Sequence, residues 1–364
     1  MGVGGYSCGG TTGLARGAPF LTRLMKENPL ISVIVLNWNG RQFLEQCLGS
    51  ILAQTYHPLE VLLVDNGSTD GSLEFVKATC PDVKVIANGK NLGYGGGNNV
   101  GIHSSRGQYI MILNNDTRLD LACIEELKRS IEKKDRYGAC ASKILFEHAG
   151  LRIDAAGLVV CPDGLAIGRG RWDREDRYDT ETEVFCASGC ACLFRREMLE
   201  DIGIYDEDFF AYGEDTDLGW RAQLAGWRCI YSPKAIVHHL HSASSGTYSH
   251  FKAYLVERNR IWVSLKNFPL PLVILGQFYT LRRYVWQAYG AFTGAGAAGR
   301  FTRDFSKRAL VKVLMKVYLT FWQGLPLILK KRKGIQEKRR ISKREVYTLL
   351  RQYGISAREV ALRE

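Results

Sequence analysis

The chain has 364 residues, 46% of them hydrophobic and 24% charged, which is enough apolar material for one large domain with an appendage or for two domains. Its net charge of +12 is uneven, because residues 251–364 hold 24 Lys and Arg against 6 Asp and Glu, whereas residues 1–250 hold 25 against 31. An acidic front part without a known nucleic-acid-binding motif argues against a nucleic-acid-binding protein, so we expect no nucleic-acid partner.

Residues 1–27 are rich in glycine and lack the apolar core of a signal peptide, so we predict a disordered leader, with Met25 as a second plausible start of translation. The ten cysteines of the chain are irregularly spaced. Cys186, Cys190 and Cys192 lie close together without the second ligand cluster of a zinc site, which favours reduced, packed cysteines of a cytosolic protein over zinc.

Four short apolar runs in the first third of the chain alternate with segments of helical periodicity. The runs are rich in Val, Ile and Leu, which is typical of strands buried on both faces. Alternating strands and helices predict an α/β fold in which helices cover both faces of a parallel sheet. The predicted strands are 31–36, 59–64, 83–87 and 109–113.

A polar motif follows each predicted strand at the point where the strand leaves the core. The motifs are NWN at 37–39, DNGSTD at 65–70, NLGYGGGNN at 91–99 and NND at 114–116. Parallel sheets bind ligands beyond the carboxyl ends of their strands. A single motif could be a simple turn, but four that converge on one edge predict a polar site of nucleotide size.

Two of these motifs have a structural interpretation beside the functional one. Asp65 can accept hydrogen bonds from a base or ribose, or it can form a turn with Ser68 and Thr69 and cap the next helix, which is the better interpretation of Asp65 alone. The glycines of 93–97, before a predicted helix, can let backbone amides approach a phosphate. They match neither the GxGxxG fingerprint nor the P-loop, so this signal is weak by itself.

Polar residues in three motifs are candidates for catalysis and metal binding. Asp116 can bind a divalent ion that bridges a diphosphate, because phosphate and water supply the other ligands. In GEDTDLGW, Asp215 can act as a general base if neighbouring aromatic rings desolvate it, although acids in a first helical turn also complement the helix dipole. Asp217 and Arg221, four residues apart, can pair. His239 lies in VHHLH, where a histidine can complete a metal site.

Taken in order, these motifs resemble those of the inverting family 2 glycosyltransferases of the GT-A fold, in the rhamnosyltransferase-like branch. The resemblance covers residues 30 to about 250 and lies in SVIVLNWNG, VLLVDNGSTDGS, NLGYGGGNNVGI, YIMILNNDT, FFAYGEDTDLGWRAQLAGW and VHHLHSASSG. It implies a catalytic domain over residues 28–250, built on a Rossmann-like nucleotide-binding sheet with helices on both faces. A helical region over residues 251–364 would follow it.

The resemblance also implies a role for each site residue. Asp215 is the implied catalytic base, and Asp116 and His239 are the implied ligands of a divalent metal, Mg²⁺ or Mn²⁺. Asn114 stands where the DxD element of the family has its first Asp, so Asp116 alone would supply the metal carboxylate. The other histidines of VHHLH are implied to be incidental. The implied donor-binding residues are Asn39, Asp65, Asn91, Gly93, Gly97, Asn99, Asn115 and Asp116.

The implied reaction transfers a sugar, in one displacement with inversion, from a nucleoside-diphosphate sugar to a hydroxyl of a lipid-linked or cell-surface glycan. L-rhamnose from dTDP-rhamnose is the expected donor sugar, and UDP-galactofuranose, UDP-galactose and UDP-N-acetylglucosamine are the alternatives. Such an enzyme would take part in the biosynthesis of a cell wall polysaccharide. A non-catalytic membrane scaffold is the alternative of a different class, and the intact Asp65, Asp116 and Asp215 argue against it.

Residues 251–364 combine basic and apolar segments, which predicts amphipathic helices at an anionic membrane surface. The run 310–329 is nearly long enough to span a bilayer, but Lys312 and Lys316 interrupt it. We therefore expect peripheral attachment to the cytoplasmic face of the cell membrane. A truncation near Phe268 is expected to release a soluble domain that still binds the donor nucleotide. A helical domain packed on the catalytic core is the alternative.

Overall fold

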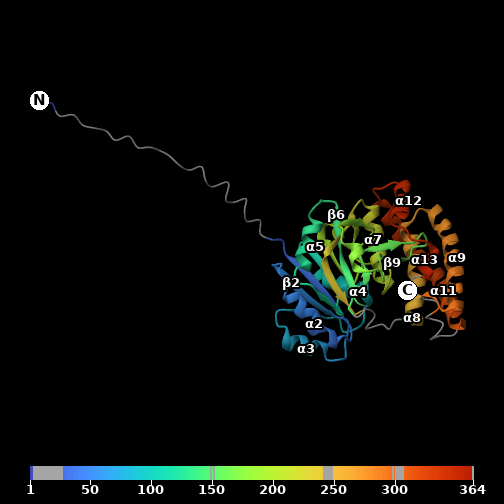
Figure 1. The fold of residues 1–364 in the computed structure, drawn as a ribbon, viewed down its shortest axis with the longest axis horizontal. Helices are drawn as coiled ribbons and strands as arrows, with labels where there is room; N and C mark the ends of the chain where they lie inside the picture. The colour runs from blue at the N-terminus through green and yellow to red at the C-terminus, as the bar shows by residue number, and fades with distance from the viewer. Residues whose placement is uncertain are drawn as a thin grey trace.

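The computed structural model of the chain describes residues 1–2, 28–147, 150, 152–240, 249–296, 299 and 307–362. The leader predicted from the sequence therefore lies almost wholly outside the described residues. Within them, a central mixed sheet is flanked by helices on both faces, and further helices follow toward the C-terminus (Figure 1). This arrangement confirms the predicted α/β architecture.

The four strands predicted from the sequence form the parallel half of the sheet. They pair in the order β3-β2-β1-β4, and every bound lies within one residue of the prediction. Because the strands are parallel and in register, the ends of β1, β2 and β4 meet at one edge, where Asn37 pairs with Asp65 and Leu36 with Asn114. These strands are β1 (Ile31–Asn37), β2 (Leu59–Asp65), β3 (Lys84–Ala87) and β4 (Tyr109–Asn114).

The other half of the sheet is not parallel throughout, which corrects the prediction. β11 lies antiparallel between β4 and β6, and β6 in turn pairs in parallel with β12. The short strand β5 pairs antiparallel with the end of β12, so that His239 lies opposite Thr117. The strands of this half and its edges are β5 (Thr117–Leu119), β6 (Tyr137–Phe146), β7 (Ile153–Ala155), β10 (Thr182–Val184), β11 (Ala191–Arg195) and β12 (Arg228–His239). A separate small sheet consists of β8 (Leu158–Val160) and β9 (Ala166–Gly168).

Helices on the two faces of the sheet bury separate apolar clusters. On one face, α2, α3 and α5 contribute residues such as Leu48 and Leu127, and on the other, α4, α6 and α7 contribute residues such as Ile102 and Leu218. These helices are α2 (Arg41–Leu52), α3 (Ser72–Thr79), α4 (Gly93–Ser104), α5 (Cys123–Ile131), α6 (Arg196–Ile202) and α7 (Glu214–Leu224), with short 3-10 helices η1 (Glu175–Tyr178) and η2 (Glu207–Phe209).

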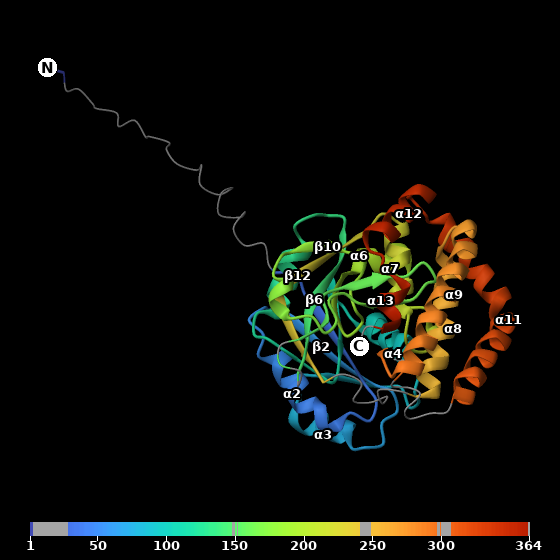
Figure 2. The ribbon, with the colours of Figure 1, turned by 45° about the vertical axis from the view of Figure 1, so that its right-hand side comes forward.

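The C-terminal helices pack against α7 and share a third apolar cluster with it. Trp220 of α7 lies in this cluster with Phe268, Ile328 and Val346, and all four are buried. A truncation near Phe268 would therefore open a core, which argues against the predicted release of a soluble domain. Figure 2 shows α8, α9 and α11 side by side along one side of the molecule. These helices are α8 (His250–Asn267), α9 (Leu270–Thr293), α11 (Lys307–Glu337), α12 (Lys343–Gln352) and α13 (Ala357–Leu362).

Candidate active site

Asp116, His239 and Asp154 form a chain of polar contacts at the edge of the sheet. Asp116 lies in the turn between β4 and β5, and the pairing of β5 with β12 brings His239, the last residue of β12, beside it. His239 Nε2 lies 3.4 Å from Asp116 Oδ1, and His239 Nδ1 lies 2.7 Å from Asp154 Oδ2 in β7. All three side chains are buried. The structure thus brings together the two predicted metal ligands and places His239 on a strand rather than on an exposed loop.

Cys190 is a further neighbour of His239. Burial lowers the pKa of His239, but the Cys190 thiol and the carboxylates of Asp116 and Asp154 outweigh this effect and raise that pKa well above its usual value. Burial also raises the pKa of Cys190 itself, although the neighbouring His239 opposes that rise. The described cysteines are all free, and each except Cys80 is buried, as expected for packed, reduced thiols.

The pair of Asp116 and His239 fits a divalent cation whose other ligands come from a diphosphate and water. The facing atoms of the two side chains are 3.4 Å apart, which is close enough for both to bind one ion. Asp154 contacts the opposite ring nitrogen of His239, and such a carboxylate commonly fixes the ring of a metal-binding histidine. Among the described residues, no group of three or more His, Cys, Asp or Glu side chains forms a ready-made metal cage. A metal here would therefore depend on its substrate.

Asp215, the predicted base, lies in the first turn of α7. A short turn at Gly189 and Cys190 contacts Asp215 on one side and His239 on the other. Gly189 N–H donates to Asp215 Oδ2 at 3.2 Å, and Thr216 N–H donates to Oδ1 at 2.6 Å. Gly189 immediately precedes Cys190, and the Tyr94 hydroxyl donates to the Gly189 carbonyl. Burial raises the pKa of Asp215, although the hydrogen bonds from Gly189 and Thr216 oppose that rise. A held, desolvated carboxylate of this kind is suited to accept a proton.

Glu214, next to the predicted base, behaves differently. Glu214 is 5% exposed, and its Oε2 has no hydrogen-bond partner within the described structure, whereas Asp215 is half-buried. Burial, followed by the charge of Asp215, raises the pKa of Glu214 to about 8. Glu214 is therefore mostly protonated at neutral pH, whereas the hydrogen bonds from Gly189 and Thr216 favour the charged form of Asp215. This division favours Asp215 over Glu214 as the base.

Asp65 and Asn39 hold the turns after β2 and β1 together. Asp65 is fully buried, and its Oδ1 accepts hydrogen bonds from the N–H groups of Gly67 at 3.0 Å and Ser68 at 2.8 Å. Its Oδ2 accepts from Asn37 Nδ2 at 3.0 Å, and Asn39 N–H donates to Ser68 Oγ at 2.9 Å. The turn interpretation therefore accounts for the hydrogen bonds of Asp65. It does not cap α3, whose N-cap position has no side-chain hydrogen bond.

The glycine-rich motif opens α4, and the glycines of 93–97 lie within the first turns of that helix rather than before it. Gly93 is the first residue of the helix, with a φ of 77°, and a Cβ at this position would lie 2.4 Å from the Phe210 carbonyl oxygen. A Cβ at Gly97 would lie 2.4 Å from Leu36 Cδ1. The glycines therefore allow α4 to approach β1 and the segment before α7 closely.

Besides Asn39, the three other asparagines predicted to bind the donor are engaged within the protein. Asn91 Oδ1 accepts from the first N–H of α4 at 2.8 Å, and Asn115 Nδ2 donates to Asn37 Oδ1 at 2.7 Å. Asn99 bonds the backbone of Tyr205 at both ends of its amide, at 2.9 and 3.1 Å. Asn91 and Asn115 thus lie at the polar edge of the sheet. Asn99 fastens the loop before η2, and a donor contact from it would require breaking these hydrogen bonds.

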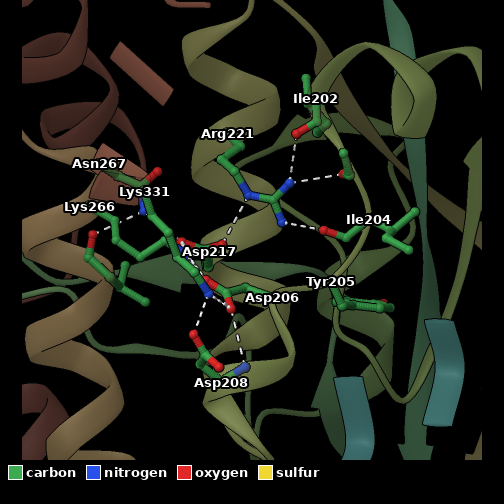
Figure 3. A network of polar contacts seen from close by, with 12 residues as sticks. Ile202, Ile204, Tyr205, Asp206, Asp208, Asp217, Arg221, Lys266, Asn267 and Lys331 are labelled. Atoms are coloured by element: carbon green, nitrogen blue, oxygen red, sulfur yellow. Dashed lines mark hydrogen bonds and ion pairs between the residues drawn. The ribbon is translucent and has the colours of Figure 1, made fainter. Parts of the chain in front are cut away.

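A buried network of charges anchors α7 to the C-terminal helices (Figure 3). Asp217 bonds Arg221 Nε at 3.0 Å, which confirms the predicted pair, and it also lies 2.9 Å from Lys266 Nζ of α8. Lys266 pairs in addition with Asp206, which Lys331 of α11 also contacts. Burial raises the pKa of Asp217, but the charges of Lys266 and Arg221 prevail and lower it to about 2. Helix α7, which carries Asp215, is therefore anchored by Lys266 and Lys331, which lie far along the chain.

Three members of the site were not predicted from the sequence, namely Asp154, Tyr94 and Cys190. The available signal for Asp154 was a single carboxylate inside the apolar run 153–160. Tyr94 is the one bulky residue among the glycines of its motif. No local pattern marks Cys190, because its role follows from the pairing of β11 with β4, which places it near the end of β4.

The sequence of the chain is similar to sequences of known glycosyltransferases. Residues 32–203 match the family described as glycosyl transferase family 2. The N-acetylglucosaminyl-diphospho-decaprenol L-rhamnosyltransferase of Mycobacterium tuberculosis is 29% identical to the chain over 264 residues, which cover 64% of this chain and 86% of that protein.

Solved structures show the same fold. The crystal structure of GalNAc-T7 with UDP, GalNAc and Mn²⁺ superposes with a TM-score of 0.58 at 17% identity, over 72% of this chain and 51% of that one. S. aureus TarS 1-349 in complex with UDP-GlcNAc gives a TM-score of 0.52 at 18% identity, over 88% of this chain and 91% of that one. Residues 32–203 therefore form a glycosyl transferase family 2 domain, within a chain of GT-A-like α/β fold.

Proposed function

We propose that this glycosyltransferase moves L-rhamnose from dTDP-rhamnose to a hydroxyl of a glycan carried on a lipid diphosphate, in the biosynthesis of a cell wall polysaccharide. The observation that carries the proposal is the turn at Gly189 and Cys190, which joins Asp215 on one side to His239 and Asp116 on the other. The choice of sugar and acceptor is supported by the M. tuberculosis relative, whose name specifies an L-rhamnosyltransferase and N-acetylglucosaminyl-diphospho-decaprenol.

In the proposed reaction, Asp215 accepts the proton of the acceptor hydroxyl. The hydroxyl oxygen attacks the anomeric carbon opposite the departing diphosphate, so the configuration inverts without a covalent enzyme intermediate. Gly189 and Thr216 hold the carboxylate of Asp215 in place before the reaction, which lowers the cost of reaching the reactive geometry. The protonated state of Glu214 keeps a second negative charge away from the base.

Asp116 and His239 are the proposed ligands of Mg²⁺ or Mn²⁺, and Asp154 orients the ring of His239. When bound, such an ion offsets the charge that develops on the departing nucleoside diphosphate. The presence of Mn²⁺ in the GalNAc-T7 structure supports this choice of cation. We propose donor contacts along the same polar edge of the sheet, from Asn39, Asp65, Asn91, Gly93, Gly97 and Asn115. A donor contact from Asn99 is proposed only with loss of its hydrogen bonds to Tyr205.

We further propose that the enzyme lies on the cytoplasmic face of the cell membrane without crossing it. The structure, as far as it describes the chain, contains no helix that is both long and apolar enough to span a membrane. Each basic residue near an anionic surface contributes about 1 kcal/mol, and the C-terminal helices are rich in such residues. The support for membrane contact comes from exposed apolar side chains on α9 and α11, among them Ile274, Phe278, Leu281, Val285, Val311, Met315, Leu319 and Trp322.

Flotation with anionic liposomes tests the membrane proposal. We expect the full-length protein to float at low salt and to be released only partly by high salt, since apolar contact adds to the charge. Failure to float at low salt would reject membrane attachment.

A product assay with a panel of donors tests the reaction. Purified enzyme receives N-acetylglucosaminyl-diphospho-lipid as the acceptor, with dTDP-rhamnose, UDP-galactofuranose, UDP-galactose or UDP-N-acetylglucosamine as the donor. We expect a product only with dTDP-rhamnose. A product with one of the UDP-sugars alone would overturn the donor assignment. The scaffold alternative predicts no product with any donor.

A further inference from the structure

A cavity of about 640 Å³ lies between the first turn of α8 and the N-terminal half of α11. Its lining combines aromatic side chains of α8, Phe251 and Tyr254, with three cations of α11, Arg308, Lys312 and Lys316. The three cations follow one another at intervals of four residues, so they lie on one face of the helix and all border the cavity.

These three cations are not neutralised by a described carboxylate. Lys316 Nζ lies 4.5 Å from the centre of the Tyr254 ring, and among the described residues none of the three forms an ion pair with Asp or Glu. Further along the same helix, Lys331 pairs with both Asp206 and Asp208. Cations that repel one another around a cavity favour a ligand with several negative charges, and phosphate oxygens form strong charge-assisted hydrogen bonds with such groups.

The cavity adjoins the segment that carries the base. The ring of Phe251, in its wall, packs edge-to-face on Phe210, with ring centres 5.8 Å apart. The next residue, Lys252, lies 5.2 Å from the centre of the Tyr212 ring. Phe210 and Tyr212 shortly precede Asp215, and both have a positive φ, of 65° and 67°, which bulky residues adopt only when their surroundings impose it. The constrained segment that leads to Asp215 therefore packs against Phe251, in the wall of the cavity.

An apolar surface borders the cations on α11. Val311 and Met315 directly precede the cavity residues Lys312 and Lys316, and Leu319 lies one turn further along the helix. Their side chains are 56%, 60% and 66% exposed, respectively. They recur at intervals of four residues and so form a continuous stripe along the helix. The anion-binding face of α11 thus lies beside a face suited to a hydrocarbon chain.

We propose that the cavity binds the diphosphate of the lipid-linked acceptor, with the sugar directed toward Asp215 and the hydrocarbon chain along the apolar stripe of α11. This inference rests on the proposed function, because it assigns a binding site to the acceptor named there. Anionic phospholipid headgroups offer the same phosphate chemistry. The acceptor is the better match because the lysines line a cavity near the segment that leads to Asp215, whereas a bulk lipid surface would need only exposed charge.

Farnesyl diphosphate is the binding probe, since it carries the diphosphate and a lipid chain without any glycan, and farnesol is its uncharged counterpart. The test variant is K312A/K316A. The matched control is K330A/K333A, which removes two exposed lysines of the same helix that do not line the cavity. We expect the test variant to bind farnesyl diphosphate about tenfold or more weakly for each cation lost, and the control to bind it as the wild type does. Binding of nucleoside diphosphate and the thermal unfolding midpoint should stay unchanged in both variants.

In the transfer assay, the test variant should show a raised KM for the lipid-diphosphate acceptor with kcat nearly preserved. If both variants bound farnesyl diphosphate equally weakly, the inference would be overturned. It would also be overturned if the wild type bound farnesol as tightly as farnesyl diphosphate. So would a test variant that loses binding to phosphatidylglycerol vesicles while it keeps its affinity for farnesyl diphosphate.

The inference and the proposed function fail in different ways. Transfer by the wild type with an unchanged acceptor KM in K312A/K316A would reject the cavity and retain the function. Lysine-dependent binding of farnesyl diphosphate by an enzyme that transfers no sugar to any lipid-diphosphate acceptor would reject the function and retain the cavity as a lipid-diphosphate site.

Discussion

Replacing Lys266 by Met tests the charge network that fastens α7 to the C-terminal helices. Lys266 is 2% exposed, its Nζ lies 2.9 Å from Asp217 Oδ1, and it also pairs with Asp206. Met has a similar length and no charge, so Lys266→Met leaves the packing largely filled. The substitution therefore isolates the loss of one cation from a buried network.

Asp217 determines the size of the expected effect, because it is fully buried. Its pKa of about 2 in the folded protein, against an ordinary value of 3.8, corresponds to about 2 kcal/mol of net stabilisation of the carboxylate. Because the folded pKa is depressed, this stabilisation is fully present above pH 3.8 and is lost as the pH falls toward 2. Breaking a buried ion pair costs about 3–5 kcal/mol, and we expect the lower end, about 3 kcal/mol, since Arg221 still bonds Asp217.

Urea unfolding at pH 7, followed by tryptophan fluorescence, measures this effect. The matched control is Lys330→Met on α11, whose side chain is exposed, and it should change stability by less than about 0.5 kcal/mol. The double variant D217N/K266M should recover part of the loss, because it removes the carboxylate that the first change leaves underpaired. A loss below about 1 kcal/mol for Lys266→Met would refute the reasoning.

The remaining predictions concern the site itself. Asp215→Asn should lower kcat by about a hundredfold or more while nucleoside-diphosphate binding stays near normal by calorimetry, and near-normal turnover would remove Asp215 from its role as base. The pKa of Glu214 is about 8 in the folded protein, above its ordinary value of 4.5. Between these two pH values the folded protein holds the proton more tightly than the unfolded chain, so the free energy of unfolding of the wild type falls by about 1.4 kcal/mol per pH unit as the pH rises. Glu214→Gln should lack that slope in urea midpoints measured from pH 5 to pH 8, and an unchanged slope would contradict the assignment. Asp116→Ala should weaken nucleoside-diphosphate binding only when Mg²⁺ or Mn²⁺ is present, and Asp154→Asn should weaken the metal-dependent part roughly tenfold to a hundredfold. Full wild-type activity in EDTA would exclude the metal role.

The parallel half of the fold could be predicted from the sequence because its signals are local. A strand buried on both faces is a continuous apolar run, and polar turn residues mark its end, as at Asn37, Asp65 and Asn114. Parallel strands then bring these ends to one edge, so the position of the polar site followed from the strands alone.

The rest depends on long-range pairing, which no local pattern specifies. The antiparallel insertion of β11 places Cys190 near the end of β4, and the contact of Asp217 with Lys266 joins α7 to α8. The apolar run around Phe268 was attributed to a membrane surface, but Phe268 is fully buried against Trp220. Apolar side chains have the same sequence pattern whether protein or lipid covers them, so periodicity cannot distinguish the two.

The anomeric configuration of the product tests the central claim most directly. Purified wild type and Asp215→Asn would receive dTDP-rhamnose and N-acetylglucosaminyl-diphospho-lipid, and NMR of the product would assign the new linkage. We predict that the wild type forms a rhamnoside of configuration opposite to that of the donor, and that Asp215→Asn forms it about a hundredfold or more slowly. A product that retains the configuration of the donor, or one formed equally fast by both enzymes, would contradict direct displacement with Asp215 as the base.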